Sequence, residues 1–264
     1  MTEKLVRFER RDGIAILTLC DPPANAYTHE MMRDLDDAIL RARFDDDVKA
    51  IVLTGDGEKF FCAGANIQML EQVDPGFKYY FCLHANETLS RLEQTPKLVV
   101  AALNGHCVGG GFEVALACDL RIARKAGGKC GLPEVSLGVL PGTGGTQRLL
   151  RLMGRSRAMK LMIEGKNIDF ETAQNEGLID ELLEVDSEGF LHAVLERVAE
   201  FLPPARASLA VGLIKRACVS GSDMSFDQGL ALERELQQQL FRSDDAREGM
   251  AAFNEKRKAR FSGK

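Results

Sequence analysis

Hydrophobic and polar residues alternate along the first part of the chain with the periods of strands and helices in turn. Leu5 to Phe8, Ile14 to Cys20 and Lys49 to Thr54 are short apolar runs next to turn residues, which is typical of strands. Between them, apolar residues recur every three or four positions from His29 to Phe44, and Thr28 stands where a helix N-cap is expected. The pattern therefore predicts a mixed α/β chain.

The same alternation continues through the middle of the chain. It predicts a helix over 79–94, a strand over 98–103, a helix over 110–117 and a strand over 119–123. Residues 68–80 lack a clear period and contain Asp74-Pro75-Gly76, which is typical of a turn, so we expect an irregular segment there.

The pattern changes near the C-terminus. From Asp186 onward it predicts almost only helices, over 186–202, 204–220, 225–242 and 244–258. This shift divides the chain into a core, residues 1–199, and a helical subdomain, residues 200–264.

The most informative stretch follows the apolar run Leu98 to Leu103. The three glycines Gly109 to Gly111 let the backbone approach a ligand closely, and the next helix would point unpaired N–H groups at it. This suits an anion, or an oxygen that becomes anionic in a reaction. Two carboxylates accompany the turn, Glu113 in the helix and Glu134, which follows Pro133. Taken alone, Glu113 could simply stabilise the helix through its dipole, and Glu134 could be a surface acid in the first turn after Pro133.

Together these residues resemble the enoyl-CoA hydratase (crotonase) family. The likeness is carried by Gly109 to Glu113, Leu132-Pro133-Glu134, Leu137-Gly138, Pro141 to Arg148 and the C-terminal stretch Arg247 to Lys258. It implies an α/β fold, a crotonase-like spiral of ββα units with a C-terminal helical subdomain. It also implies the addition of water to a 2-enoyl-CoA thioester to give a 3-hydroxyacyl-CoA. An enoyl-CoA isomerase, or a hydratase for an unusual acyl group, stays open as the alternative.

The resemblance also implies roles for individual residues. The backbone N–H groups of Ala65 and Gly110 would form an oxyanion hole. Glu113 would activate water and Glu134 would protonate the α-carbon, although the residues alone do not separate these two roles. Tyr79, Tyr80 and Phe81 would either line an acyl pocket or belong to the core.

CoA is part of the substrate in this interpretation, so no separate cofactor is expected. The resemblance places CoA against the turn Ala63 to Gln68 and the loop near Ala24. The residues expected to bind it are Ala24, Ala63, Ala65, Asn66, Ile67 and Gln68. Lys256 would reach a CoA phosphate across a subunit interface, or would be a solvated helix charge. Asn66 stands where many members have Asp, and Gln237 where some have an aromatic residue. The family also implies a homotrimer or a dimer of trimers.

Composition argues against several other classes of protein. The net charge of −5 and the lack of a basic, aromatic-rich run disfavour a nucleic-acid binder, although some relatives bind RNA. No apolar run reaches the roughly 18 residues that a membrane span needs, and Met1 to Leu5 resembles neither a signal nor a transit peptide. Motifs of nucleotide-binding enzymes and serine hydrolases are missing from the sequence.

The cysteines indicate a reducing compartment. Seven are scattered along the chain without a Cys-x-x-Cys pair, so we expect reduced, mostly buried thiols and no metal site. With the missing export signal, this predicts a cytoplasmic protein.

Overall fold

The computed structural model describes residues 4–264. The expectation that no leader peptide is present falls mainly on residues 1–3, which lie outside the described residues. The strands are β1 (Val6–Arg11), β2 (Ile14–Leu19), β3 (Ala50–Gly55), β4 (Phe60–Cys62), β5 (Leu98–Leu103), β6 (His106–Val108), β7 (Leu120–Arg124), β8 (Lys129–Gly131), β9 (Ile168–Asp169) and β10 (Glu181–Leu183).

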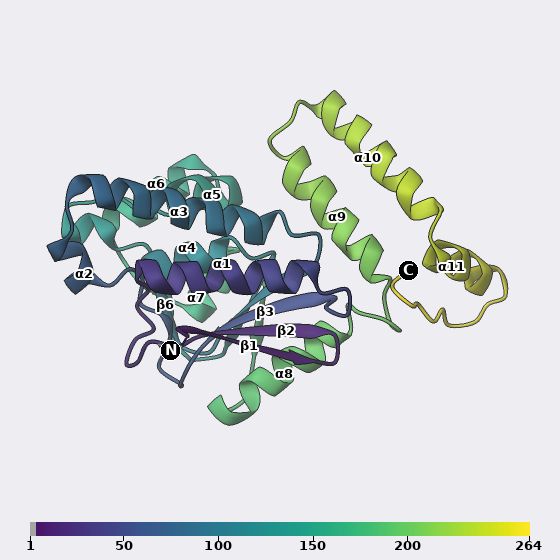
Figure 1. Cartoon of the computed structure of the whole chain (residues 1–264), viewed down its shortest axis with the longest axis horizontal. Coiled ribbons are helices and arrows are strands. Elements are labelled where there is room, and N and C mark those ends of the chain that lie inside the picture. Colours follow the sequence, from purple (N-terminus) through teal and green to yellow (C-terminus); the bar gives the residue numbers. More distant parts are fainter. Residues whose placement is uncertain (1–3) are drawn as a thin grey trace.

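Helices connect and cover these strands (Figure 1). The helices are α1 (His29–Phe44), α2 (Ile67–Gln72), α3 (Pro75–Glu93), α4 (Gly110–Leu116), the short 3-10 helix η1 (Glu134–Leu137), α5 (Gly145–Met153), α6 (Arg155–Glu164), α7 (Phe170–Asn175), α8 (Ser187–Ala199), α9 (Ser208–Gly221), α10 (Phe226–Phe241) and α11 (Asp244–Asn254). The prediction of a mixed α/β chain is confirmed.

A six-stranded sheet forms the centre of the core, in the order β1-β2-β3-β5-β7-β10. β1 and β2 are antiparallel, and the remaining neighbours pair in parallel. Every residue of β2, β3 and β5 is buried, which explains their continuous apolar sequences. Residues of α1, α3 and α4 pack on one face of this sheet, and residues of α8 pack on the other.

A smaller sheet, in the order β4-β6-β8-β9, lies beside the large one. Its strands β4 and β6 run parallel, with Phe60 opposite His106 and Cys62 opposite Cys107. Because the carboxyl ends of parallel strands meet at one edge, the turns after Cys62 and Val108 are brought together there.

Helix α1 has the predicted bounds and cap. The Thr28 hydroxyl accepts a hydrogen bond from the Met31 N–H, and the apolar face of the helix is buried from Met31 to Ala42. Here the local pattern and the tertiary packing agree, so the sequence alone predicted the bounds and the cap of α1.

The expectation of an irregular segment over residues 68–80 is wrong. Most of it is helical, because Asn66 caps α2 by accepting from Met69 N–H and Asp74 caps α3 by accepting from Gly76 and Phe77 N–H groups. Pro75 then occupies the first turn of α3, where its missing N–H costs nothing. Asp-Pro-Gly is thus a helix start, and not a turn between helices.

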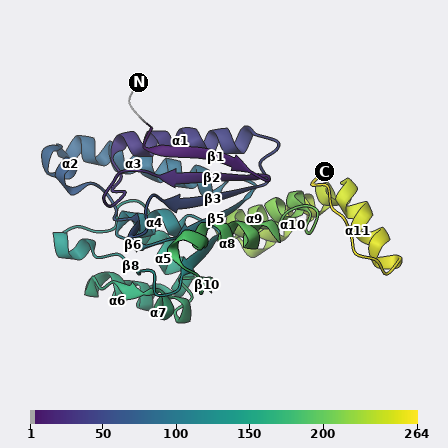
Figure 2. The same cartoon turned by 90° about the horizontal axis from the view of Figure 1, so that it is seen from below.

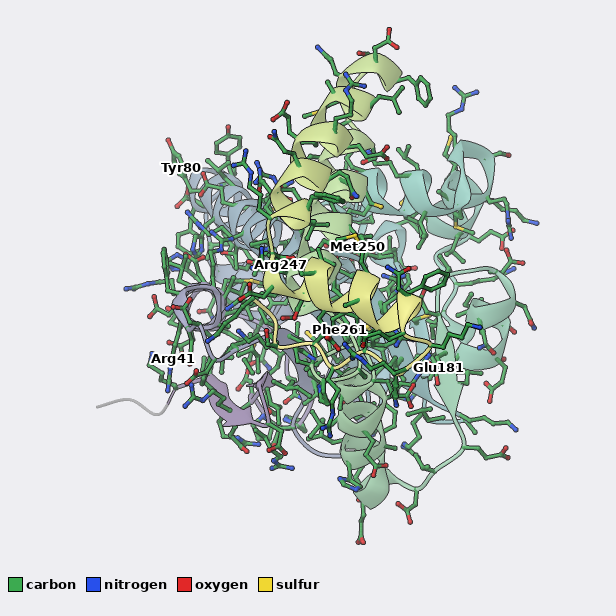
Figure 3. All side chains as sticks on the ribbon, turned by 90° about the vertical axis from the view of Figure 1, so that its right-hand side faces the viewer. Arg41, Tyr80, Glu181, Arg247, Met250 and Phe261 are labelled. Carbon is green, nitrogen blue, oxygen red and sulfur yellow. The ribbon has the colours of Figure 1, made fainter. Side chains whose placement is uncertain are left out.

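The C-terminal helices α9, α10 and α11 extend away from the core (Figures 1 and 2). Helix α11 ends at Asn254, four residues earlier than predicted, and Lys256 has a left-handed backbone (φ +56°). The chain then folds back, with Ser262 and Gly263 N–H groups donating to the buried Asp245 carboxylate. Figure 3 shows Met250 and Phe261 in this same region. Helix α9 contacts β5 of the core. The domain boundary at residue 200 stays a prediction.

Two other expectations can be compared with the packing. Cys62, Cys107, Cys118 and Cys130 are buried free thiols, whereas Cys218 is exposed. Within residues 4–264, no helix is both long and apolar enough to cross a membrane.

Candidate active site

The turn after Cys62, which contains Gly64, lies directly against the turn after Val108, which contains Gly109. A Cβ added to Gly64 would lie 2.9 Å from the Gly110 nitrogen and 3.2 Å from the Val108 oxygen. Gly64 (φ +93°) and Gly109 (φ +55°) both have backbone conformations that favour glycine. Close approach of the two turns therefore depends on the glycines that the sequence places there.

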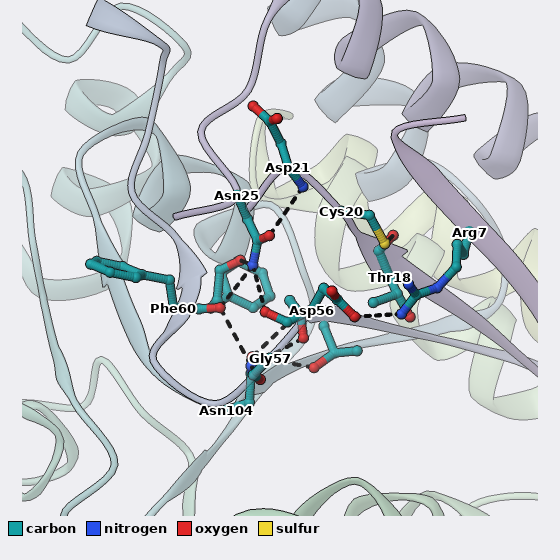
Figure 4. Close-up of polar contacts among 12 residues, drawn as sticks. Arg7, Thr18, Cys20, Asp21, Asn25, Asp56, Gly57, Phe60 and Asn104 are labelled. Carbon is teal, nitrogen blue, oxygen red and sulfur yellow. Dashed lines mark hydrogen bonds and ion pairs between the residues drawn. The ribbon is translucent and has the colours of Figure 1, made fainter. Parts of the chain in front are cut away.

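Two buried asparagines hold the loop that leads into the first turn (Figure 4). The Asn25 amide donates to the Asp56 and Phe60 carbonyls, each at 3.0 Å, and its oxygen accepts from the Asp21 N–H. The Asn104 amide donates to the Gly57 carbonyl at 2.7 Å. These bonds satisfy the loop carbonyls and fix the backbone before the turn.

Backbone N–H groups of Ala65 and Gly110 are available to a ligand. Ala65 lies in a bridge with Tyr27, in which its neighbours Gly64 and Asn66 make both hydrogen bonds. Among the described residues, neither Ala65 nor Gly110 donates its N–H to another protein group. Two unpaired donors on adjoining turns form an arrangement suited to an oxygen that gains negative charge.

Glu113 lies in the first turn of α4 and is 2% exposed. Its Oε1 accepts hydrogen bonds of 2.7 Å from the N–H groups of Thr143 and Gly145. Burial raises the pKa of the Glu113 carboxyl, and the hydrogen bonds from Gly145 and Thr143 oppose that shift. A fixed, partly stabilised carboxylate results, and this is the state that a general base requires.

Glu134 lies on η1 and approaches the second glycine turn. Its Oε1 would lie 3.1 Å from a Cβ on Gly109, and its Oε2 is buried with no hydrogen-bond partner among the described residues. Burial, reinforced by the negative charge of Glu113, raises the pKa of Glu134 to about 7. Glu134 is therefore suited to hold and donate a proton near neutral pH.

The structure brings most of the predicted site residues together. The Ala63 N–H donates to the Ala24 carbonyl at 3.0 Å, Asn66 caps α2, and Ile67 and Gln68 are exposed on its first turn. Ala24 and residues 63–68 thus form one surface next to the unpaired N–H groups.

Other predicted residues lie apart from that surface. Lys256 is exposed beyond α11, which Figure 2 shows at the far end of the molecule from α4. Gln237 lines a separate cavity of about 370 Å³ among the C-terminal helices. Of the three aromatic residues considered for an acyl pocket, Tyr79 and Tyr80 are exposed and Phe81 is buried.

The sequence did not reveal which groups bind the Glu113 carboxylate. Thr143 and Gly145 belong to the stretch that carries the family resemblance, but nothing in the pattern predicted their contact with a residue some thirty positions earlier. The signal is the run Gly142-Thr143-Gly144-Gly145, whose small residues permit close backbone approach.

Comparisons with known proteins give the family of the chain. The sequence model of the enoyl-CoA hydratase/isomerase family matches residues 9–264. The chain belongs to this family. It is 37% identical to a short-chain-enoyl-CoA hydratase of Clostridium acetobutylicum, over 96% of this chain and 95% of the relative. It is 34% identical to a crotonyl-CoA hydratase of Syntrophomonas wolfei over the full length of both.

Solved structures of the family share the fold. An enoyl-CoA hydratase from Geobacillus kaustophilus superposes with a TM-score of 0.95 at 42% identity, covering 100% of this chain and 98% of the other. The predicted crotonase fold is confirmed, and the chain is an enoyl-CoA hydratase/isomerase family enzyme.

Proposed function

We propose that this protein is an enoyl-CoA hydratase that adds water to a 2-enoyl-CoA thioester and forms a 3-hydroxyacyl-CoA. The observation that carries the proposal is the pair Glu113 and Glu134, held beside the unpaired N–H groups of Ala65 and Gly110. The two carboxyls differ in hydrogen bonding. The bonds from Gly145 and Thr143 oppose the rise that burial causes in the pKa of Glu113, whereas burial raises the pKa of Glu134 to about 7.

Each group then has one task. The thioester oxygen lies between the Ala65 and Gly110 N–H groups, which stabilise its negative charge as the enolate forms. Glu113 takes a proton from water as the water oxygen bonds to the β-carbon, and Glu134 gives its proton to the α-carbon. Transfer of the proton from Glu113 back to Glu134 through a solvent molecule restores the starting state.

The CoA portion would lie over the surface formed by Ala24, Ala63, Ala65, Asn66, Ile67 and Gln68. This surface adjoins the two oxyanion donors, so a thioester held there would place its carbonyl between them. The exposed side chains of Ile67 and Gln68 are free to contact the nucleotide end.

Lys256 would bind a CoA phosphate that is held by another copy of the chain. In its own chain it follows α11, and Figure 2 shows α11 far from α4. Large apolar side chains are exposed on the C-terminal helices, including Phe241 at 63% and Phe253 at 84%. Such surfaces are typical of subunit contacts, which supports a homotrimer or a dimer of trimers. Light scattering of the purified protein tests the assembly, and a monomer would contradict it.

Scattered thiols without a disulfide among the described residues support action in the cytoplasm. A role in fatty-acid β-oxidation follows if simple straight-chain enoyl-CoA thioesters prove to be substrates.

The proposal is tested by mixing the enzyme with crotonyl-CoA and following the loss of enoyl-thioester absorbance. Glu113→Gln and Glu134→Gln should each lower kcat about 10²–10⁴-fold, because each removes a group that moves a proton. Glu71→Gln, an exposed change on α2, is the matched control. If the wild type does not consume crotonyl-CoA, a general short-chain hydratase is rejected. Turnover of a 3-enoyl thioester would then favour an isomerase, and turnover of branched or cyclic enoyl thioesters a specialised hydratase.

A further inference from the structure

Tyr27 lies at the junction of the parts that form the candidate active site. It is 3% exposed, and its ring packs against Phe81 with centroids 5.9 Å apart. The other two tyrosines, Tyr79 and Tyr80, are 66% and 68% exposed. Tyr80 lies at the periphery of the molecule in Figure 3. Tyr27 is therefore the one buried tyrosine among the described residues.

The backbone of Tyr27 fixes the first oxyanion turn. Its N–H donates to the Gly64 carbonyl and its carbonyl accepts from the Asn66 N–H, both at 2.9 Å. Ala65 lies between these two bonds, so its own N–H points away from Tyr27 and stays available.

The Tyr27 hydroxyl reaches the second oxyanion turn. A Cβ on Gly110 would lie only 2.1 Å from this oxygen, so the hydroxyl packs directly over the Gly110 backbone. One side chain therefore contacts the residue that supplies the second N–H, while its backbone holds the residue that supplies the first.

The same hydroxyl also connects to Glu113. It lies 3.0 Å from Thr143 Oγ1, and the Thr143 N–H donates to Glu113 Oε1 at 2.7 Å. The Thr143 side chain also lowers the pKa of Glu113 against the effect of burial. A Thr143 hydroxyl that supports the ionised form of Glu113 turns its hydrogen toward that carboxylate, and in this arrangement Tyr27 is the donor in its bond with Thr143. Burial and the negative charge of Glu113 raise the pKa of Tyr27, which keeps this donor protonated.

We propose that Tyr27 is a positioning residue that fixes Glu113 relative to both oxyanion donors, through the relay Tyr27–Thr143–Glu113 and through its backbone bonds to the first turn. The inference rests on the proposed hydratase function. Through the relay, Tyr27 polarises Thr143, which supports the Glu113 carboxylate. The backbone bonds of Tyr27 set the distance between Glu113 and the oxyanion hole.

Tyr27→Phe tests the relay because it removes only the hydroxyl. We expect kcat to fall about fivefold to tenfold, the effect of losing roughly one hydrogen bond to a reacting group, with little change in KM. The ascending limb of the pH profile of kcat should also move to higher pH, because an ionised Glu113 has lost support. Ser222→Ala, which removes an exposed hydroxyl outside the site, is the control and should behave as wild type.

Thr143→Val and Thr143→Ser show whether the effect travels through the relay. Thr143→Val should resemble Tyr27→Phe and the double variant should be no worse than Thr143→Val alone, whereas Thr143→Ser keeps the hydroxyl and should retain activity. Additive losses in the double variant, or a wild-type rate and pH profile in Tyr27→Phe, would overturn the proposal.

A titration without substrate separates this inference from the hydratase proposal. Carbon NMR of glutamate-labelled protein should show a higher Glu113 pKa in Tyr27→Phe than in wild type. If the wild type fails on every thioester but this shift is seen, the hydratase function is wrong and the relay stands. If the wild type is active and the Glu113 titration is unchanged, the relay is wrong and the function stands.

Discussion

Glu113 and Glu134 belong to one site but have opposite hydrogen bonding. Glu113 Oε1 accepts two N–H bonds of 2.7 Å, whereas Glu134 Oε2 is buried and accepts none from the described residues. N–H donors stabilise the ionised form and burial favours the neutral form, so this difference supports the proposal of Glu113 as the base and Glu134 as the acid. This division gives each glutamate its proposed role, which the residue pattern alone did not.

The first prediction concerns the pH dependence of hydration. The pKa of Glu134 is raised to about 7 and its proton is needed, so kcat/KM should fall as pH rises through about 7. The pKa of Glu113 is raised above its ordinary value and its ionised form is needed, so the rate should also fall on the acid side. Initial rates with crotonyl-CoA across a range of pH measure both limbs. A rate that stays constant well above pH 7 would exclude Glu134 as the acid.

The second prediction concerns stability. In Glu134 the folded-state pKa of about 7 lies above the ordinary 4.5, so its contribution to stability is complete below 4.5 and is lost as pH rises through 7. Above pH 7, the folded protein bears the cost of an ionised, partly buried Glu134, and Glu134→Gln removes that cost. The variant should therefore raise the free energy of unfolding by about 1–2 kcal/mol above pH 7, since partial exposure screens part of the cost.

Urea denaturation of wild type and Glu134→Gln at several pH values tests this stability difference. The advantage of the variant should shrink as pH falls from 7 toward 4.5. Glu71→Gln, on the exposed surface of α2, should show no such dependence. An equal difference at all pH values would point to packing, and not to the charge of Glu134.

Much of the fold was predictable because local and long-range preferences coincide. Helix α1 has its Thr28 cap and its buried face where the sequence places them. The start of α3 was missed because Asp74-Pro75-Gly76 fits a turn as well as a capped helix, and only the tertiary contacts decide between them.

The site was predictable only in part, for a similar reason. Its glycines and glutamates form a recognisable pattern along the chain. The contact between Tyr27 and Thr143 joins residues 116 positions apart, and neither residue has a local feature that indicates the other. Such contacts follow from the arrangement of the elements, which the residue pattern alone does not give.

The third prediction concerns Gly110, which is proposed to supply the second oxyanion donor. Gly110→Ala would place its Cβ 2.1 Å from the Tyr27 hydroxyl and 2.7 Å from two ring carbons, so the turn or the ring must move. Displacing an oxyanion N–H should lower kcat about 10²-fold, together with a loss of thermal stability. Gly221→Ala is the control, because a Cβ there meets nothing within 4 Å. An unchanged rate in Gly110→Ala would remove Gly110 from the oxyanion hole.

The fourth prediction concerns the attachment of the C-terminal helices to the core. Lys215 on α9 has a side chain only 6% exposed, and its Nζ lies 2.9 Å from the Asp119 carboxylate. It also donates to the Lys97 and Leu92 carbonyls at 3.1 and 3.3 Å. Lys215→Met removes the cation and leaves the Asp119 carboxylate, whose side chain is 17% exposed, without this counter-charge, which should cost about 3 kcal/mol. Unfolding should therefore begin at a lower urea concentration, and α9 should become accessible to proteases. Arg216→Met, the exposed neighbour on the same helix, should change neither. If Lys215→Met is as stable as Arg216→Met, the ion pair does not hold α9 to the core, and apolar packing of α9 must do so instead.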